Sequence, residues 1–474
     1  MKKRMTAVIA GDGTLRCVKE EIPELKEHEV LVKVHASLIS PGTEMAAAKK
    51  RRENPDEKAE AIRFGYSNAG EIIKVRGDVK GLKVGMRVAA MGAGMALHSN
   101  YACVPVNLVV PIPDSVTYEQ AAYLSLAATS LQAVRRTEPA LGEYGAVLGL
   151  GIVGNIAAQL YRLSGARVIG WDGFRSRIAT AKKCGIADAV DFIRKDAVEA
   201  TKLFASPWGL DFALFAFGGN ADKALESIKK CVKISADGHE MGRIVLVGGC
   251  RLAVDGGATS GNLDFRASSR TGAGYHDHDW EYGRDYPPAF VQFTTQRNAQ
   301  ELIRLIAEKR LLVDPMTTHR IPIEDVADAG DLLIDHPDKA LGVILEMNHK
   351  KCGAAWHSDL DLSGFALPIR NHGCRSSVNL RRRSWWIWKL SPLGIRARRV
   401  PPDLRKGSAN SFQSHMRWNV LRRCFRLSMA SLSIRRTGTG TWNRRNLLSK
   451  RESPSSSTNP LRGIRKTPIS FWTG

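Results

Sequence analysis

One stretch near the middle of the chain constrains the fold more than any other. A short apolar run at residues 146–148 leads into three glycines, a helical segment follows, and a second apolar run ends at Asp172. The glycines have the spacing G-x-G-x-x-G and are Gly149, Gly151 and Gly154. A strand, a glycine turn, a helix, a second strand and a terminal acid, in this order, are typical of a dinucleotide-binding βαβ unit.

Each part of this stretch has a role in holding a dinucleotide. The first glycine forms the tight turn, the second lets the backbone approach a pyrophosphate, and the third lets the helix pack on the strand. Ile152 and Val153 begin the helix, whose N-terminal N–H groups would then face the phosphates. The alternative is a glycine-rich turn without a ligand, but such a turn does not require an acid at the end of the second strand.

The acid predicts which dinucleotide is bound. A carboxylate at the position of Asp172 accepts hydrogen bonds from ribose hydroxyls and repels a 2′-phosphate, so the expected cofactor is NAD rather than NADP. Arg175 and Arg177 follow closely in the sequence. An arginine there either contacts the adenosine end of the cofactor or covers the start of the next helix.

The chain divides into a nearly neutral body and a strongly basic tail. Its 474 residues carry a formal net charge of +23, and a chain of this length predicts two or three domains. Residues 351–474 hold 25 of the 70 Lys and Arg residues but only 4 of the 47 Asp and Glu residues. Seven of the ten tryptophans also lie there, and we find neither helical nor strand periodicity.

Three interpretations of residues 351–474 compete. A basic extension with aromatic residues binds nucleic acid through phosphate contacts and stacking. A disordered linker is the second interpretation, although so many tryptophans are unusual for disorder. Translation in a shifted reading frame is the third, and the abrupt change in composition favours it. We therefore do not expect nucleic acid to be a partner.

The sequence predicts a cytoplasmic protein. The eight cysteines include no C-x-x-C pair, so neither a zinc ribbon nor a disulfide framework is indicated. After the basic start, residues 6–10 are too few for the apolar core of a signal peptide. No run reaches the ~18 apolar residues that a membrane span needs, so no membrane contact is expected.

The remaining pattern predicts two kinds of sheet. Short strands separated by glycine turns fill residues 30–112, which is typical of a small antiparallel barrel. After Asp172, strands alternate with helices, as in a parallel doubly wound sheet. Residues 341–346 read as a closing strand.

This order resembles the medium-chain dehydrogenase/reductase superfamily, the zinc-type alcohol dehydrogenases and their relatives. The resemblance is carried by residues 30–36, 42–44, 65–70, 81–88, 127–129, 149–154, 172, 177 and 321–323. It implies an α/β fold, with a GroES-like barrel domain at residues 1–127 completed by 313–348, and an NAD-binding Rossmann domain at 128–312. The basic tail at 351–474 is expected to have no defined fold.

The resemblance also implies an activity. We expect an NAD(P)-dependent oxidoreductase that transfers a hydride between the nicotinamide and an alcohol or carbonyl, and a homodimer. Residues 40–44, 65–67 and 270–286 are more similar to a sub-branch labelled zinc-binding dehydrogenase, which suggests a sugar or polyol substrate. The alternatives are a metal-free reductase of activated double bonds and a nucleic-acid-binding protein that acts through the basic tail.

The sequence departs from the family at the catalytic metal. The positions at which relatives supply cysteine, histidine and glutamate ligands fall here on Pro41, Tyr66, Ser67 and Ser125. None of these is a thiolate, imidazole or carboxylate, which are the protein ligands that zinc uses. The resemblance therefore does not extend to zinc, and another group must polarise the carbonyl and transfer the proton.

Three side chains are candidates for that chemistry. Thr43 matches the family's proton-relaying hydroxyl, with a turn threonine bonded to its own backbone as the alternative. Tyr66 replaces a zinc histidine and either faces the substrate or fills the vacated metal site. His98 is the third candidate, with a structural histidine as the alternative. The His- and Asp-rich residues 275–279 read as a solvated polar loop rather than a metal site.

Overall fold

The computed structural model describes residues 3–79, 81–254, 260–347, 349, 386–391 and 394–399. It divides into two compact units, Met1–Asp359 and Leu360–Gly474. Among the described residues, no helix combines the length and the apolar character required to cross a membrane. The first unit contains both sheets that the sequence predicts.

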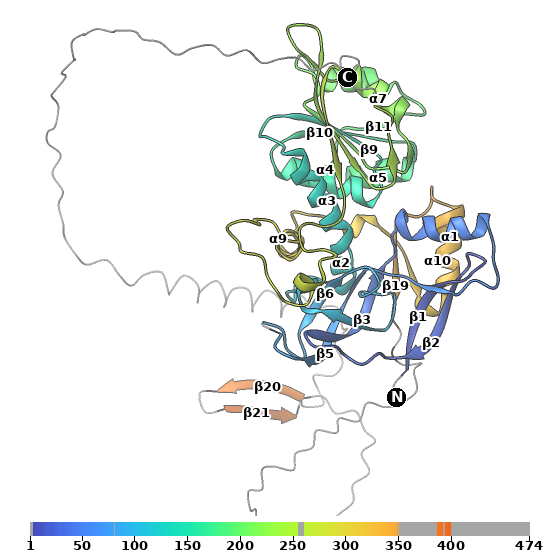
Figure 1. The fold of residues 1–474 in the computed structure, drawn as a ribbon. Coiled ribbons are helices and arrows are strands. Elements are labelled where there is room, and N and C mark those ends of the chain that lie inside the picture. The colour runs from blue at the N-terminus through green and yellow to red at the C-terminus, as the bar shows by residue number, and fades with distance from the viewer. Residues whose placement is uncertain are drawn as a thin grey trace, which may run out of the picture. The chain divides into compact units, whose positions relative to one another are not determined.

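The N-terminal part of the first unit is a strand-rich barrel domain (Figure 1). Its larger sheet has the order β18-β19-β3-β5-β6-β8, and β7 pairs with β3. These strands are β3 (Glu29–Leu38), β5 (Ser67–Arg76), β6 (Arg87–Met91), β7 (Tyr101–Pro105), β8 (Val109–Pro111), β18 (Thr317–Pro322) and β19 (Gly342–Glu346). A smaller sheet has the order β2-β1-β4, formed by β1 (Lys3–Ile9), β2 (Leu15–Glu21) and β4 (Ile62–Arg63).

The end of the body returns to this barrel. β19 runs antiparallel to β3, with Ile344 opposite Leu38, so a strand from beyond residue 340 completes a sheet begun near residue 30. The apolar sequence Gly-Val-Ile-Leu is buried in β19, as the sequence predicts for a closing strand. Helix α10 (Val326–Asp335) lies beside α1 (Thr43–Glu53), as Figure 1 shows.

The middle of the chain forms a doubly wound sheet, which confirms the predicted fold class. Its order is β11-β10-β9-β12-β15-β14, and β15 also pairs with β17. All these pairs are parallel except β14 with β15. The strands are β9 (Tyr144–Leu148), β10 (Arg167–Asp172), β11 (Ala189–Asp191), β12 (Phe212–Phe215), β14 (Lys233–Ile234), β15 (Glu240–Val247) and β17 (Asn262–Ser268). The chain leaves β9 for β10 on one side and later returns to β12 on the other, so the switch point lies between β9 and β12.

Helices connect these strands and join the two domains. The crossover helices are α4 (Ile152–Leu163), α5 (Arg175–Lys183), α6 (Ala197–Phe204) and α7 (Asp222–Lys229). The others are α2 (Tyr118–Ala121), α3 (Leu124–Thr137), α8 (His278–Glu281) and α9 (Thr295–Ala307), and a short parallel pair is formed by β13 (Gly219–Asn220) and β16 (Cys250–Arg251). Helix α3 contacts β5 and β6 of the barrel as well as β15 and β17 of the Rossmann sheet. One hydrophobic core therefore runs through both domains.

The second unit has described residues only at a hairpin. Strand β20 (Trp386–Ser391) pairs antiparallel with β21 (Gly394–Arg399). This hairpin lies within residues 351–474, where the sequence shows no strand periodicity. Its physical basis is the high strand propensity of tryptophan and isoleucine, which alternate at the start of β20.

Candidate active site

A cleft of about 960 Å³ lies at the carboxyl ends of the Rossmann strands and reaches the barrel. Ligands of open α/β sheets bind at this edge, next to the switch point. Residues 40–43 and Tyr66 line it from the barrel side, and Ser125 and Thr129 line it from α3. From the Rossmann side it is lined by the glycine turn after β9 and by the segments that follow β12, β15 and β17.

Glycine is present at each of the three positions of the turn for a different physical reason. Gly149 has φ +91°, and a Cβ there would lie 2.7 Å from the Ala216 carbonyl oxygen. A Cβ at Gly154 would lie 1.8 Å from the Gly149 carbonyl oxygen, so only glycine lets α4 pack this closely. A Cβ at Gly151 would meet nothing within 4 Å. The space beside Gly151 is therefore open to a ligand rather than closed by packing.

This open space lies at the N-terminus of α4. Gly151 is the N-cap residue, and no side chain caps the helix. Ile152 and Val153, the first residues of the helix, line the cleft together with Gly151. Unpaired N–H groups and the helix dipole favour an anion at such a position. The glycines and the start of α4 therefore fit the pyrophosphate of a dinucleotide.

Asp172 ends β10 beside this turn and is buried. Its Oδ2 accepts the Leu150 N–H at 2.8 Å, and its Oδ1 accepts the Phe174 N–H at 2.8 Å. Each carboxylate oxygen retains a second lone pair, but Asp172 is only 4% exposed and is not among the residues that line the cleft. Arg177 lines the cleft with Nη1 3.8 Å from Asp172 Oδ2, and its buried Nε has no hydrogen-bond partner among the described residues.

The residues at the family's metal positions do not fit a zinc ion. The Ser67 hydroxyl donates to the Ala122 carbonyl at 2.6 Å and accepts the Ser125 N–H at 3.2 Å, so it joins β5 to the helices. Pro41 has no side-chain donor atom. Within the parts of the chain that the structure describes, no group of three or more His, Cys, Asp or Glu side chains could hold a metal.

The Tyr66 hydroxyl occupies this part of the cleft instead. Burial raises its pKa above the ordinary tyrosine value, and the Glu44 carboxylate raises the pKa further. The nearby Ser40 and Thr43 hydroxyls offset part of this rise in the pKa of Tyr66. The phenol therefore carries its proton at neutral pH and can donate it to a substrate oxygen. Thr43, the first residue of α1, lines the same cleft.

His98 does not lie in the cleft, where a side chain that donates a proton directly to the substrate would have to lie. Its side chain is fully buried, and the cleft lining does not include it. Its two ring nitrogens contact Ser37 and Glu44. His98 is therefore held inside the barrel and is not among the residues that line the cleft.

Tyr275 is a cleft residue that the sequence analysis did not single out for catalysis. Its hydroxyl oxygen accepts the Ala93 N–H at 3.0 Å, and burial raises its pKa to about 12. The phenolic proton is therefore available to a ligand. The only local signal in the sequence near Tyr275 is the glycine-rich run at residues 271–274.

The polar loop around Tyr275 does not converge on a metal. The Asp277 carboxylate accepts the Trp280 N–H as the N-cap of α8 and accepts the Tyr286 hydroxyl at 2.5 Å. His278 is exposed, whereas His276 lines the cleft. These side chains therefore point to different partners.

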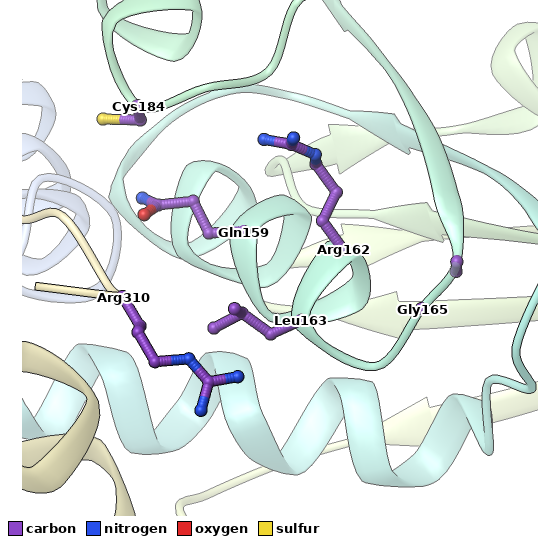
Figure 2. Close-up of a pocket in the computed structure, with 7 residues that line it drawn as sticks. Gln159, Arg162, Leu163, Gly165, Cys184 and Arg310 are labelled. Carbon is purple, nitrogen blue, oxygen red and sulfur yellow. The ribbon is translucent and has the colours of Figure 1, made fainter. Parts of the chain in front are cut away.

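A second cavity, of about 360 Å³, lies near the C-terminal end of α4 (Figure 2). Its polar groups are already paired within the protein. The Gln159 amide donates to the Leu312 carbonyl at 3.0 Å and accepts the Leu312 N–H at 2.8 Å. Arg162 donates to the Gly185 carbonyl. These hydrogen bonds join α4 to the chain at Leu312 and at Gly185.

The barrel, the doubly wound sheet and the cleft at its switch point define a two-domain dehydrogenase fold. Comparison with known proteins shows which dehydrogenases the chain resembles. Residues 26–114 match the alcohol dehydrogenase GroES-like domain. Sorbitol dehydrogenase of Bacillus subtilis (strain 168) is 28% identical over 263 residues, which are 49% of this chain and 74% of that protein.

Two further similarities agree with this match. The chloroplastic NADPH-dependent alkenal/one oxidoreductase of Arabidopsis thaliana is 29% identical over 253 residues, 49% of this chain and 62% of that protein. The crystal structure of galactitol-1-phosphate dehydrogenase from Escherichia coli superposes with a TM-score of 0.57 at 19% identity, covering 72% of this chain and 99% of that one. Residues 26–114 therefore form an alcohol dehydrogenase GroES-like domain, and the chain is similar to alcohol and polyol dehydrogenases in sequence and in fold.

Proposed function

We propose that this protein interconverts an alcohol and a carbonyl with a nicotinamide dinucleotide, without a catalytic metal. The observation that carries the proposal is one continuous cleft, with an open phosphate position at Gly151 and a protonated phenol at Tyr66. The bound nicotinamide would supply or accept the hydride. The residues of this chain bind the cofactor, orient the substrate oxygen and transfer its proton.

Tyr66 is the proposed proton donor to the substrate oxygen, and Thr43 is the proposed relay beside it. Both line the cleft, and Thr43 is close enough to Tyr66 to lower its pKa. A donor that is held in place and shielded from water stabilises developing negative charge on oxygen, which is the role of the metal in zinc enzymes. His98 enters the proposal only through its contact with Glu44.

The expected substrate is a polyol or sugar, or the corresponding carbonyl compound. Hydroxyl side chains of Ser40, Thr43, Ser125 and Thr129 line the cleft, and such groups bind substrate hydroxyls. The names of the sorbitol and galactitol-1-phosphate dehydrogenases point the same way. The test is the oxidation of NADH or NADPH by the purified full-length protein with a panel of ketoses, aldoses and simple carbonyls.

Reduction of an activated double bond is the second candidate. The absence of the usual zinc ligands and the similarity to an alkenal/one oxidoreductase favour it. A panel of enones and alkenals, assayed beside the carbonyl panel, separates the two. If the protein reduces enones but no carbonyl compound of the first panel, double-bond reduction replaces alcohol–carbonyl interconversion as the proposed function.

We expect no stoichiometric zinc in the purified protein. Proline and hydroxyl groups stand at the ligand positions, and the Ser67 hydroxyl is already paired with Ala122 and Ser125. Elemental analysis of protein purified without chelators measures the zinc content. About one zinc per chain, lost together with activity, would contradict the expectation.

We expect the cofactor to be NAD, with Asp172 as the selecting residue. Its oxygens can accept ribose hydroxyls, whereas a 2′-phosphate would lie against its charge in a poorly screened cleft. Losing hydrogen bonds to a charged partner costs ~1.5–3 kcal/mol, so Asp172→Ala should weaken NAD binding by roughly ten- to a hundred-fold. It should weaken NADP binding less, or strengthen it.

Fluorescence titration of both cofactors measures this preference. Arg175→Ala is the matched control, because Arg175 is exposed and lies 3.8 Å from Asp191 rather than in the cleft. Tighter NADP binding by the wild type would instead assign selection to Arg177, whose buried Nε could pair with a phosphate.

Three expectations from the sequence stay predictions: a homodimer, a cytoplasmic location and no nucleic-acid partner.

A further inference from the structure

The cleft carries an arginine on each of two opposite sides and no carboxylate among the described residues that line it. Arg177, in the first turn of α5, lines it beside β10, and Arg270 lines it just after β17. Strands β9, β12 and β15 lie between β10 and β17 in the sheet. Neighbouring strands are about 4.8 Å apart, so four steps separate the ends of β10 and β17 by roughly 19 Å. The two arginines therefore face different parts of whatever the cleft binds.

The proposed cofactor accounts for the Arg177 side only. The open phosphate position at Gly151 follows β9, and Asp172 ends β10, so the adenosine half would extend from the glycine turn toward Arg177. Arg270 follows the third strand from β9 in the other direction, roughly 14 Å from β9 by strand spacing alone. The phosphates of the cofactor are therefore expected at Gly151 and not at Arg270.

A series of hydrogen bonds connects Arg270 to the proposed proton donor. Arg270 Nη1 donates to the Tyr275 carbonyl at 3.2 Å, and the Tyr275 hydroxyl accepts the Ala93 N–H at 3.0 Å. The N–H of Gly92, the residue before Ala93, donates to the Tyr66 carbonyl at 3.2 Å. Arg270 therefore lies on the Tyr66 side of the cleft, one tyrosine away from the barrel segment that is bonded to Tyr66.

The guanidinium of Arg270 is available to a ligand. The nearest arginines in the sequence are ion-paired, Arg266 with Glu138 at 2.8 Å and Arg284 with Asp279 at 3.1 Å. Arg270 forms no ion pair with any residue that the structure describes, and its bond to a carbonyl leaves most of its five N–H donors unused. The planar guanidinium matches the paired oxygens of a carboxylate or a phosphate. Arg270 therefore has the free charge and the donors that an anionic ligand needs.

A second polar side chain close to Arg270 in the sequence also lacks a partner. Ser268, the last residue of β17, lines the cleft and is 6% exposed. Its buried hydroxyl has no hydrogen-bond partner among the described residues, whereas buried polar side-chain atoms are usually hydrogen-bonded in folded proteins. An oxygen of an anionic group held by Arg270 would supply an acceptor for this hydroxyl.

We propose that Arg270 binds an anionic group of the substrate, so that the substrate is a polyol or sugar that carries a phosphate or a carboxylate. The inference rests on the proposed function for the reacting alcohol or carbonyl, which would lie at Tyr66. The hydroxyl side chains of the cleft bind the neutral part of the substrate, and Arg270 with Ser268 holds the charged end. Two points of attachment, at Tyr66 and at Arg270, then orient the reacting carbon.

The first test measures binding to the full-length protein saturated with NADH. Sorbitol, sorbitol 6-phosphate and gluconate share a six-carbon chain of hydroxyl groups and differ in charge, and an alcohol beside reduced cofactor cannot react. Calorimetric titration with each compound therefore isolates the contribution of the anion. We expect both anions to bind about 10-fold more tightly than sorbitol, with a preference that falls as salt is added, and the tighter of the two identifies the group. Equal affinity for all three compounds would overturn the proposal.

Substitution of Arg270 tests the residue itself. Arg270→Gln should reduce the affinity for the two anions about 10-fold and leave the affinities for sorbitol and NADH unchanged. Arg270→Lys keeps the charge without the planar fork of donors and should recover part of the loss. Arg284→Gln is the matched control, because Arg284 is an exposed arginine that pairs with Asp279 and does not line the cleft. A loss of NADH affinity in Arg270→Gln would assign Arg270 to the cofactor and overturn the proposal.

Turnover separates this inference from the proposed function. With NAD, the wild type should oxidise the anionic polyol at a lower KM than sorbitol and at a similar kcat, and Arg270→Gln should remove the difference in KM. Oxidation of sorbitol and of the anionic polyols with equal KM, unaffected by Arg270→Gln, would overturn the inference and leave the proposed function standing. A protein that turns over no alcohol or carbonyl would refute the proposed function, and the titrations would still decide whether Arg270 binds an anion.

Discussion

Gly151→Val is expected to abolish dinucleotide binding while the protein stays folded. The new side chain would occupy the open space at the N-terminus of α4, where the structure has nothing within 4 Å of a Cβ. The backbone at Gly151 has φ −63° and ψ −172°, which valine adopts without strain. The cost to the helix cap is about 0.5–1 kcal/mol, whereas losing the pyrophosphate position should weaken binding about 100-fold or more.

Gly154→Val is the matched comparison, three residues further along the same turn. Its Cβ would lie 1.8 Å from the Gly149 carbonyl oxygen and 3.2 Å from the Ala216 Cβ, so the backbone of the turn must move. Overpacking of this kind costs roughly 1–3 kcal/mol or more, and the melting temperature should fall. Calorimetry and NADH fluorescence titration distinguish the two variants. Normal NADH affinity in Gly151→Val would remove the glycine turn from the cofactor site.

The proposed cofactor half of the site could be predicted from sequence because a dinucleotide site is built from residues that are close together along the chain. Gly149, Gly151 and Gly154 act through backbone geometry within six consecutive residues, and Asp172 follows one helix later. The regular order of strands and helices therefore determines that the glycine turn and Asp172 lie at the same edge of the sheet. The doubly wound sheet was predictable for the same reason, because each of its units repeats one local pattern.

The catalytic half depends on contacts that no local pattern records. Ser37 and His98 are 61 residues apart and meet only because β3 and the segment before β7 lie side by side. Tyr275 reaches the Ala93 N–H across 182 residues. The sequence also offered no means of telling a substrate-facing Tyr66 from a packed one, because that difference depends on the Glu44 charge and the Ser40 hydroxyl.

Helix α1 shows how tertiary packing can outweigh local pattern. The sequence predicts short strands and glycine turns for residues 30–112, yet residues Thr43–Glu53 form a helix. Its sequence has little apolar character, and the buried Met45 and Ala48 anchor it. Placing Glu44 in the first turn of a buried helix end brings its carboxylate to His98, which a turn reading does not suggest.

Tyr66→Phe is expected to lower kcat for carbonyl reduction by roughly 10²–10⁴-fold, with cofactor affinity unchanged. Only the hydroxyl is lost, so the ring still fills the vacated metal position and the fold should persist. Burial and the Glu44 charge raise the pKa of this phenol, and a raised pKa keeps the protonated form dominant through neutral and mildly alkaline pH. Reduction by the wild type should therefore not decline until the pH exceeds the usual range of tyrosine ionisation.

Steady-state kinetics of the variant across this pH range, with reduced cofactor and the best substrate of the panel, measure both effects. Tyr118→Phe on α2 is the control, because Tyr118 stacks on His35 and does not line the cleft. Loss of activity confined to Tyr66→Phe assigns the proton to this hydroxyl, since the ring and the cofactor site are unchanged. A variant with wild-type kcat would show that Tyr66 merely fills the vacated metal position, and Tyr275 would then be the remaining tyrosine in the cleft lining with a proton to donate.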